Sequence, residues 1–184
     1  MGDNGDGSGV AVDPSNPMRA YGVRNGGYRY TNNGGKIWIV PAAGPTIPTG
    51  AWRYAIDVSD PTRVWMAIGT TFAPGNVLWR SNDGTGTNWS NIATFGPNIR
   101  DLALVAVDSN VLWLGMTDGT LQRSTDATAA VPTFTPITVN GAPTGASVSE
   151  VTINPLNPND VVVTYRGLCG AQCNNLDNRM RRVF

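Results

Sequence analysis

A five-residue stretch decides how this sequence is organised, because it recurs four times without gaps: Val10-Ala11-Val12-Asp13-Pro14, Tyr54-Ala55-Ile56-Asp57-Val58, Leu102-Ala103-Leu104-Val105-Ala106 and Val151-Thr152-Ile153-Asn154-Pro155. Successive copies are separated by 44, 48 and 49 residues. A large or apolar residue follows the fourth residue of every copy after eight positions: Tyr21, Trp65, Trp113 and Val162. Two independent markers keep the same spacing, so the chain is a run of repeats of about 45 residues.

Each repeat predicts four short strands and no helix. The recurring stretch reads as a first strand, and a turn rich in Asp, Pro and Asn follows it. A second strand carries the large residue, a third has alternating character, and the fourth is centred on Trp38, Trp89 or Phe134. Four antiparallel strands in a repeat of this length are typical of the blades of a β-propeller. We therefore expect an all-β propeller.

The composition agrees with this fold and excludes several functions. Charged residues make up 14%, with one Glu and one Lys, so the residues that build helical surfaces are scarce. The formal net charge is zero, which argues against nucleic acid as a partner. No apolar stretch approaches the roughly 20 residues that span a bilayer. With no His, Ser–His and His–metal chemistry are excluded within this sequence.

The turn between the third and fourth predicted strands carries a recurring motif. The first repeat has Thr31-Asn32-Asn33-Gly34-Gly35-Lys36-Ile37-Trp38, the second runs from Ser81 and Asp83 to Trp89, and the third has Ser124-Thr125-Asp126 leading to Phe134. A hydroxyl and an acidic or amide side chain two residues apart can bond the turn amides. Glycine supplies the positive φ, and the aromatic residue packs between neighbouring blades. We expect these residues to staple a hairpin: Thr31, Asn33, Gly35, Trp38, Ser81, Asp83, Trp89, Ser124, Asp126 and Phe134.

These turns resemble the Asp-box, S/T-x-D-x-G-x-x-W. The first copy has Asn33 for Asp, the second carries one extra residue, and the third loses the Gly and has Phe134 for Trp. The resemblance covers essentially the whole chain. It implies an Asp-box (BNR) β-propeller, a superfamily that includes sialidases, xyloglucanases and sortilin-like receptors. Membership implies the fold and leaves the activity open.

The repeat spacing divides residues 1–184 into three blades and half of a fourth. We expect the blades at about 8–42, 52–94, 100–139 and 149–184, the last incomplete, so that the chain is a partial propeller. Propellers close with four to eight blades. The missing blades of a longer polypeptide are therefore the expected main partner.

Candidate binding residues precede the first strand of each repeat: Ser8-Gly9, Trp52-Arg53, Arg100-Asp101 and Ser149-Glu150. We expect them to form loops at one mouth of the central channel, and they vary between repeats as a binding surface does. Trp52 would stack on a sugar, and Arg53, Arg100, Asp101 and Glu150 would contact a glycan or a protein ligand. Ordinary ion pairs between loop charges are the alternative and the commoner arrangement.

Catalysis has weak support. A glycosidase usually needs two carboxylates across the scissile bond, and Asp101 and Glu150 in adjacent repeats are the candidates. The arginine motif F/Y-R-I-P of sialidases is absent. We expect no metal and no cofactor.

The two cysteines, Cys169 and Cys173, lie in a predicted insertion over 166–181 between the second and third strands of the last repeat. Two thiols are too few for structural zinc, so we predict a local disulfide and an oxidising compartment. The expected location is secreted or cell-surface, that is, extracellular or periplasmic.

The sequence therefore predicts a non-catalytic propeller module that scaffolds or binds partners or glycans at its channel mouth. Two alternatives stay open. One is part of a sialidase-like or xyloglucanase-like glycoside hydrolase whose active site is incomplete in this chain. The other is a structural subunit of an extracellular assembly.

Overall fold

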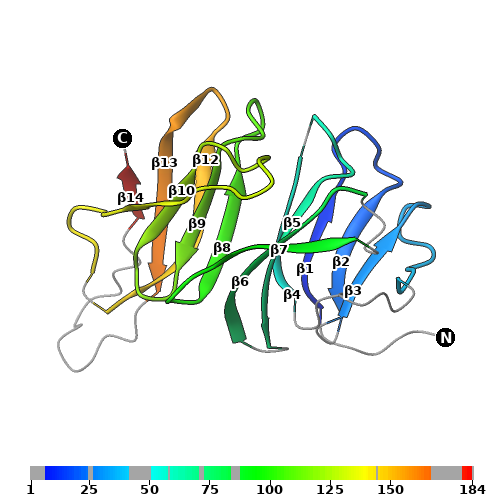
Figure 1. Ribbon diagram of the computed structural model, residues 1–184, viewed down its shortest axis with the longest axis horizontal. Helices are drawn as coiled ribbons and strands as arrows, with labels where there is room; N and C mark the ends of the chain where they lie inside the picture. Colours follow the sequence, from blue (N-terminus) through cyan, green and yellow to red (C-terminus); the bar gives the residue numbers. More distant parts are fainter. Residues whose placement is uncertain are drawn as a thin grey trace. The chain divides into compact units, whose positions relative to one another are not determined.

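The structure, a computed structural model, consists of antiparallel strands in four sheets (Figure 1). It describes residues 7–24, 27–41, 51–57, 59–70, 73–83, 88–143, 145–166 and 180–183. No helix occurs in these ranges, and none of their segments is a helix that could span a membrane. The chain divides into two compact units, Met1–Gly96 and Pro97–Phe184.

Unit 1 contains the first and second sheets, and unit 2 contains the third and fourth. The first sheet is β1 (Gly7–Val12), β2 (Ala20–Arg24) and β3 (Gly27–Thr31). The second is β4 (Ala51–Ile56), β5 (Val64–Thr70), β6 (Ala73–Ser81) and β7 (Trp89–Thr94). The third is β8 (Ile99–Leu104), β9 (Leu112–Met116), β10 (Leu121–Ser124) and β11 (Thr135–Ile137). The fourth is β12 (Ser147–Asn154), β13 (Asn157–Arg166) and β14 (Met180–Val183).

Strands that follow one another in the sequence are neighbours in every sheet, as the repeat predicts. The fourth strands differ from the prediction in two repeats. In the first sheet the segment around Trp38 makes only the bridge Tyr30↔Ile39, and in the third sheet Phe134 lies just before β11. The third strand and the segment after the turn are thus the constant part of this hairpin, and the length of the fourth strand varies.

A β-bulge occurs at the same repeat position near the start of every first strand. The register shifts across Ser8 in β1, Trp52 in β4, Arg100 in β8 and Ser149 in β12. The prediction that these residues and their followers form loops was wrong, because they lie inside the strands. A bulge leaves one residue outside the ladder and re-aims its side chain, and this accounts for the polar, variable residues that suggested a loop.

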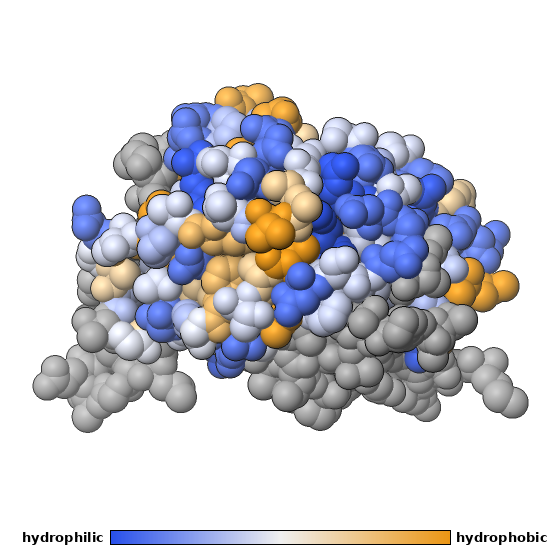
Figure 2. Space-filling view, in the orientation of Figure 1, coloured by the Kyte–Doolittle hydropathy of each residue, from blue (hydrophilic) through white to orange (hydrophobic). Residues whose placement is uncertain are grey.

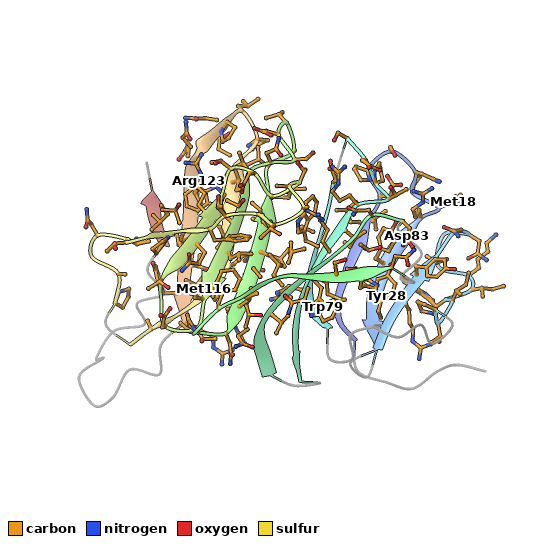
Figure 3. The ribbon with its side chains drawn as sticks, viewed as in Figure 1. Met18, Tyr28, Trp79, Asp83, Met116 and Arg123 are labelled. Carbon is orange, nitrogen blue, oxygen red and sulfur yellow. The ribbon has the colours of Figure 1, made fainter. Side chains whose placement is uncertain are left out.

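The core of unit 1 lies between its two sheets. Tyr21 and Tyr28 of the first sheet are fully buried against Val64, Met66 and Trp89 of the second. Trp89 meets the Tyr28 ring edge-on, with centroids 5.2 Å apart and planes at 78°. The Tyr21 hydroxyl donates to the Pro61 carbonyl at 2.9 Å, and burial raises the pKa of Tyr21. Tyr28 and the half-buried Trp79 are labelled in Figure 3.

The core of unit 2 is built from valines between the third and fourth sheets. Val148, Val151, Val161 and Val163 of the fourth sheet pack with Trp113 and Leu121 of the third. The Arg123 guanidinium lies over the Trp113 ring, 5.3 Å from the ring centroid, and Arg123 Nη2 lies 3.5 Å from Asn159 Oδ1 (Figure 3 labels Arg123). The large residue of the second strand therefore packs between sheets in both units.

A buried aspartate organises the turn after the first strand in both repeats of unit 1. Asp57 Oδ1 accepts hydrogen bonds from the Ser59 amide, the Ser59 hydroxyl and the Asp60 amide, and Asp57 Oδ2 lies 2.6 Å from Arg63 Nη1. Asp13 repeats the arrangement with Ser15 and Asn16, and its Oδ2 lies 3.6 Å from Arg19 Nη1. The shared sequence D-x-S-N/D-P-x-R at 13–19 and 57–63 marks this turn.

The same two positions carry different pairs in unit 2. The third repeat has Val105 and Val111, both buried and both part of the apolar core. The fourth has Asn154 and Asp160, with Asn154 Nδ2 3.0 Å from Asp160 Oδ2. The backbone bond between the two positions is conserved between Asp57 and Arg63 at 3.1 Å and between Val105 and Val111 at 2.9 Å. The turn thus occurs with an ion pair, an apolar pair or an amide–carboxylate pair at these two positions.

Candidate functional site

The turns between third and fourth strands are closed by a hydroxyl and an acceptor two residues later. Thr31 Oγ1 donates to Asn33 Oδ1 at 2.9 Å, Ser81 Oγ to Asp83 Oδ1 at 2.8 Å, and Ser124 Oγ to Asp126 Oδ1 at 2.8 Å. The residue after the turn is then held by the same acceptor. Asn33 Oδ1 accepts the Ile37 amide at 2.9 Å, and Asp126 Oδ1 accepts the Thr133 amide at 2.8 Å.

The first of these turns contains two glycines with positive φ, and the aromatic residues of the three motifs differ in burial. Gly34 and Gly35 have φ of 70° and 82°, which residues with a Cβ rarely adopt. Trp89 of the second repeat is buried between sheets, whereas Trp38 remains 38% exposed and Phe134 is half-buried. The polar groups of the turns bond to one another and to turn amides, so these groups act in hairpin structure.

Asp126 gives this turn a pH dependence. The Ser124 hydroxyl first, and then the Thr133 amide, hold the pKa of Asp126 below its ordinary value. A lowered folded-state pKa stabilises the fold above the ordinary value of about 3.9 and loses this contribution as the pH falls through the lowered value. We expect Asp126→Asn, which keeps the Oδ1 acceptor as Asn33 does, to be less stable than wild type at pH 7. The difference between the two proteins should be smaller at pH 2.5 than at pH 7.

Urea denaturation at the two pH values measures this difference. Asp126→Ala, which lacks the acceptor, should be less stable than both proteins at both pH values. A constant difference between wild type and Asp126→Asn across the two pH values would contradict the role of the ionised carboxylate.

The residues at the bulges are candidate binding residues in both units. In unit 1, Arg53 is half-buried, and nothing is described of the side chains of Ser8 and Trp52. In unit 2, Arg100 and Ser149 are half-buried and Glu150 is exposed. The Ser149 hydroxyl lies 2.7 Å from Thr164 Oγ1. The bulged ends of β8 and β12 therefore bring Arg100, Asp101, Ser149 and Glu150 to corresponding positions in adjacent sheets.

Asp101 has a structural contact that sequence reasoning missed. It is 8% exposed, and its Oδ2 accepts the backbone amide of Val151 at 2.8 Å. Because Val151 belongs to β12 of the next sheet, Asp101 links the first strands of two sheets. First strands have no neighbouring strand on their inner side in these sheets, and a side-chain acceptor satisfies an amide at such an edge. The carboxylate is thus engaged in holding two sheets together.

Among the described ranges, no group of three or more His, Cys, Asp or Glu residues is placed to hold a metal ion. Cys169, Cys173 and most of the predicted insertion lie outside the described residues.

Solved structures with this architecture define the class of fold, a β-propeller built from antiparallel four-stranded sheets. The GH74 enzyme of Niastella koreensis matches with a TM-score of 0.67 and 24% identity over 84% of this chain and 24% of its own. The GH74 xyloglucanase of Xanthomonas campestris matches with a TM-score of 0.63 and 20% identity over 88% of this chain and 27% of its own. An auxiliary nutrient-binding protein of Bacteroides thetaiotaomicron matches with a TM-score of 0.64 and 13% identity over 88% of this chain and 36% of its own.

The TM-scores show a common fold, and the chain spans roughly a quarter to a third of the length of these proteins. No protein-family model and no curated protein matches the sequence.

Proposed function

We propose that this chain is a non-catalytic β-propeller module that binds a glycan or a protein partner at the bulged ends of its first strands. One observation carries the proposal. The bulge recurs at the same position in all four sheets, while the residues that it presents differ from sheet to sheet. A constant backbone with variable side chains at one edge is an arrangement that suits ligand recognition.

The position of Asp101 supports a binding function over a catalytic one. A general acid or nucleophile must reach its substrate, whereas the buried Asp101 carboxylate accepts the Val151 amide. Glu150 then stands as a single exposed carboxylate among the four described residues at the bulges of unit 2.

Carbohydrate is the ligand class that the similar structures favour. Two of them are GH74 enzymes, one a xyloglucanase, and the third is a nutrient-binding protein. The same likeness supports the second candidate function, part of a glycoside hydrolase whose remaining catalytic groups lie elsewhere in a longer polypeptide.

Titration calorimetry against xyloglucan oligosaccharides, other β-glucan oligosaccharides and sialosides tests the proposal. We expect the protein to bind one of these classes of oligosaccharide without hydrolysing it. Arg100→Ala and Glu150→Gln should each weaken it at least about tenfold, which corresponds to about 1.4 kcal/mol. Leu156→Ser, in the exposed turn between β12 and β13, is the matched control and should leave the affinity unchanged. Turnover of a glycan that Glu150→Gln abolishes would overturn the non-catalytic assignment and establish the hydrolase.

Three narrower assignments belong to the same proposal. The hydrogen bonds of the turns at Thr31, Ser81 and Ser124 support the Asp-box (BNR) repeat class. A disulfide between Cys169 and Cys173, and a secreted or cell-surface location, are supported by the cysteine spacing and the low charge.

A further inference from the structure

The chain has four Asn-Gly pairs, and the structure describes two of them, Asn33-Gly34 and Asn140-Gly141. In such a pair the backbone nitrogen of the glycine can attack the side-chain carbonyl carbon of the asparagine, because a glycine has no Cβ to hinder the approach. Two conditions decide whether a folded protein permits this reaction. The asparagine side chain must be able to turn toward the glycine nitrogen, and that nitrogen must be able to lose its hydrogen.

Hydrogen bonds restrain the first pair, which lies in the turn after β3. Asn33 Oδ1 accepts the Thr31 hydroxyl and the Ile37 amide, both at 2.9 Å. The Gly34 amide donates to the Met18 carbonyl at 2.9 Å. A bond from the Gly34 nitrogen to Asn33 Cγ therefore requires the loss of the Gly34 hydrogen bond, and rotation of the Asn33 side chain breaks the two bonds to Oδ1. Each of these bonds stabilises the starting state, so the turn protects Asn33.

The second pair has none of these restraints. Asn140 and Gly141 are both exposed, at the centre of a turn that the Ala142 amide closes by donating to the Val139 carbonyl at 3.1 Å. Within the described residues, neither the Asn140 side chain nor the Gly141 amide makes a hydrogen bond. The turn lies between β11 and β12, where Figure 2 shows hydrophilic surface at the left-hand edge of unit 2. Both conditions for the reaction are thus met at this pair.

We propose that Asn140 is the site of a spontaneous modification, deamidation through a succinimide. The Gly141 nitrogen forms a bond to Asn140 Cγ, and the side-chain nitrogen leaves as ammonia together with the hydrogen of the Gly141 amide. Water then opens the ring. Hydrolysis at the side-chain carbonyl leaves an aspartate, and hydrolysis at the main-chain carbonyl leaves an isoaspartate, in which the main chain runs through Cβ and Cγ. Water is the only co-reactant.

The modification changes the connection between the third and fourth sheets. Both products place a negative charge on the turn, and the isoaspartate also adds one carbon atom to its main chain. Residues on both sides of the pair are anchored, because Val139 is 7% exposed in the core of unit 2 and Ala142 packs against the same core. The lengthened main chain therefore has to fit between two residues that the core holds in place.

Peptide mapping by mass spectrometry, over a time series in neutral and mildly alkaline buffer, tests the proposal on the full chain. In the folded protein we expect Asn140 to convert at least about tenfold faster than Asn33. Its rate should rise with pH, because the attacking nitrogen must lose a proton. In urea, where the fold restrains neither pair, the two rates should approach each other. Asn140→Gln, with a side chain one carbon longer, is the matched control and should show no conversion at this position over the same time.

Thr31→Ala tests the protection of the first pair. It removes the hydroxyl that donates to Asn33 Oδ1, so Asn33 should convert faster than in wild type while the rate at Asn140 stays unchanged. Circular dichroism verifies that the variant is folded. Equal rates at Asn33 and Asn140 in the folded wild-type protein, or an Asn140 that converts only in urea, would overturn the proposal. An unchanged rate at Asn33 in Thr31→Ala would overturn the protective role of the hydroxyl.

Discussion

Asp57→Ala should lower the free energy of unfolding of unit 1 by about 3–5 kcal/mol, which is a large fraction of the total stability of a typical domain. The Asp57 carboxylate is fully buried and accepts from two amides and a hydroxyl at the turn between β4 and β5. Its loss leaves these donors without their acceptor and leaves Arg63 with Asp60 alone, at 3.3 Å. Asp13→Ala should cost less, because the corresponding Arg19 lies farther from its carboxylate. Urea denaturation monitored by tryptophan fluorescence measures both.

The third repeat supplies the control for this prediction. Val105 and Val111 occupy the positions of Asp57 and Arg63, and the turn keeps its backbone hydrogen bond. The double variant Asp57→Val/Arg63→Val should therefore recover most of the stability and lie within about 2 kcal/mol of wild type, since an apolar pair can replace a buried ion pair. A double variant as unstable as Asp57→Ala would show that the turn depends on the carboxylate itself.

The strand order of all four sheets was predictable from the sequence, because each strand repeats at fixed spacing and each large residue recurs in step. Tyr21 and Trp113 show why this works. Their positions face a neighbouring sheet, so burial favours a large apolar side chain at both. The hydroxyl–acceptor pairs of the turns were predictable for a related reason, since Ser124 and Asp126 are close in sequence and bond locally.

The bulged ends were not predictable from the same signals. Arg100 and Ser149 are polar and variable, and such residues suggest a loop, but a bulge lets a strand continue past them. The contact from Asp101 to Val151 spans 50 residues and depends on how two sheets pack, which no local pattern encodes. The Asp57–Arg63 pair did leave a signal, because D-x-S-N/D-P-x-R occurs twice at the same repeat position.

Gly115→Ala should destabilise unit 2 by about 3 kcal/mol, because β9 and β12 pack too closely at this point for a side chain. A Cβ on Gly115 would overlap Cγ1 of Val148 and would lie 3.0 Å from Cγ2 of Val151. Both valines are buried, and the β-branched Val148 has little rotamer freedom with which to yield. Gly96→Ala is the matched control. Nothing lies within 4 Å of a methyl group added at Gly96, so the free energy of unfolding of this variant should differ from that of wild type by no more than about 0.5 kcal/mol.

Combining Gly115→Ala with Val148→Ala tests whether the cause is this single contact. Val148→Ala alone should cost about 2 kcal/mol through the cavity that it leaves. In the double variant the new methyl group enters that cavity, so the overlap and the cavity offset each other. The double variant should then be more stable than the sum of the single changes predicts by at least about 2 kcal/mol. Strictly additive losses in urea denaturation would mean that β9 and β12 do not pack face to face at Gly115. They would also contradict the contact of Asp101 with the Val151 amide, because that contact depends on the same packing of the third and fourth sheets.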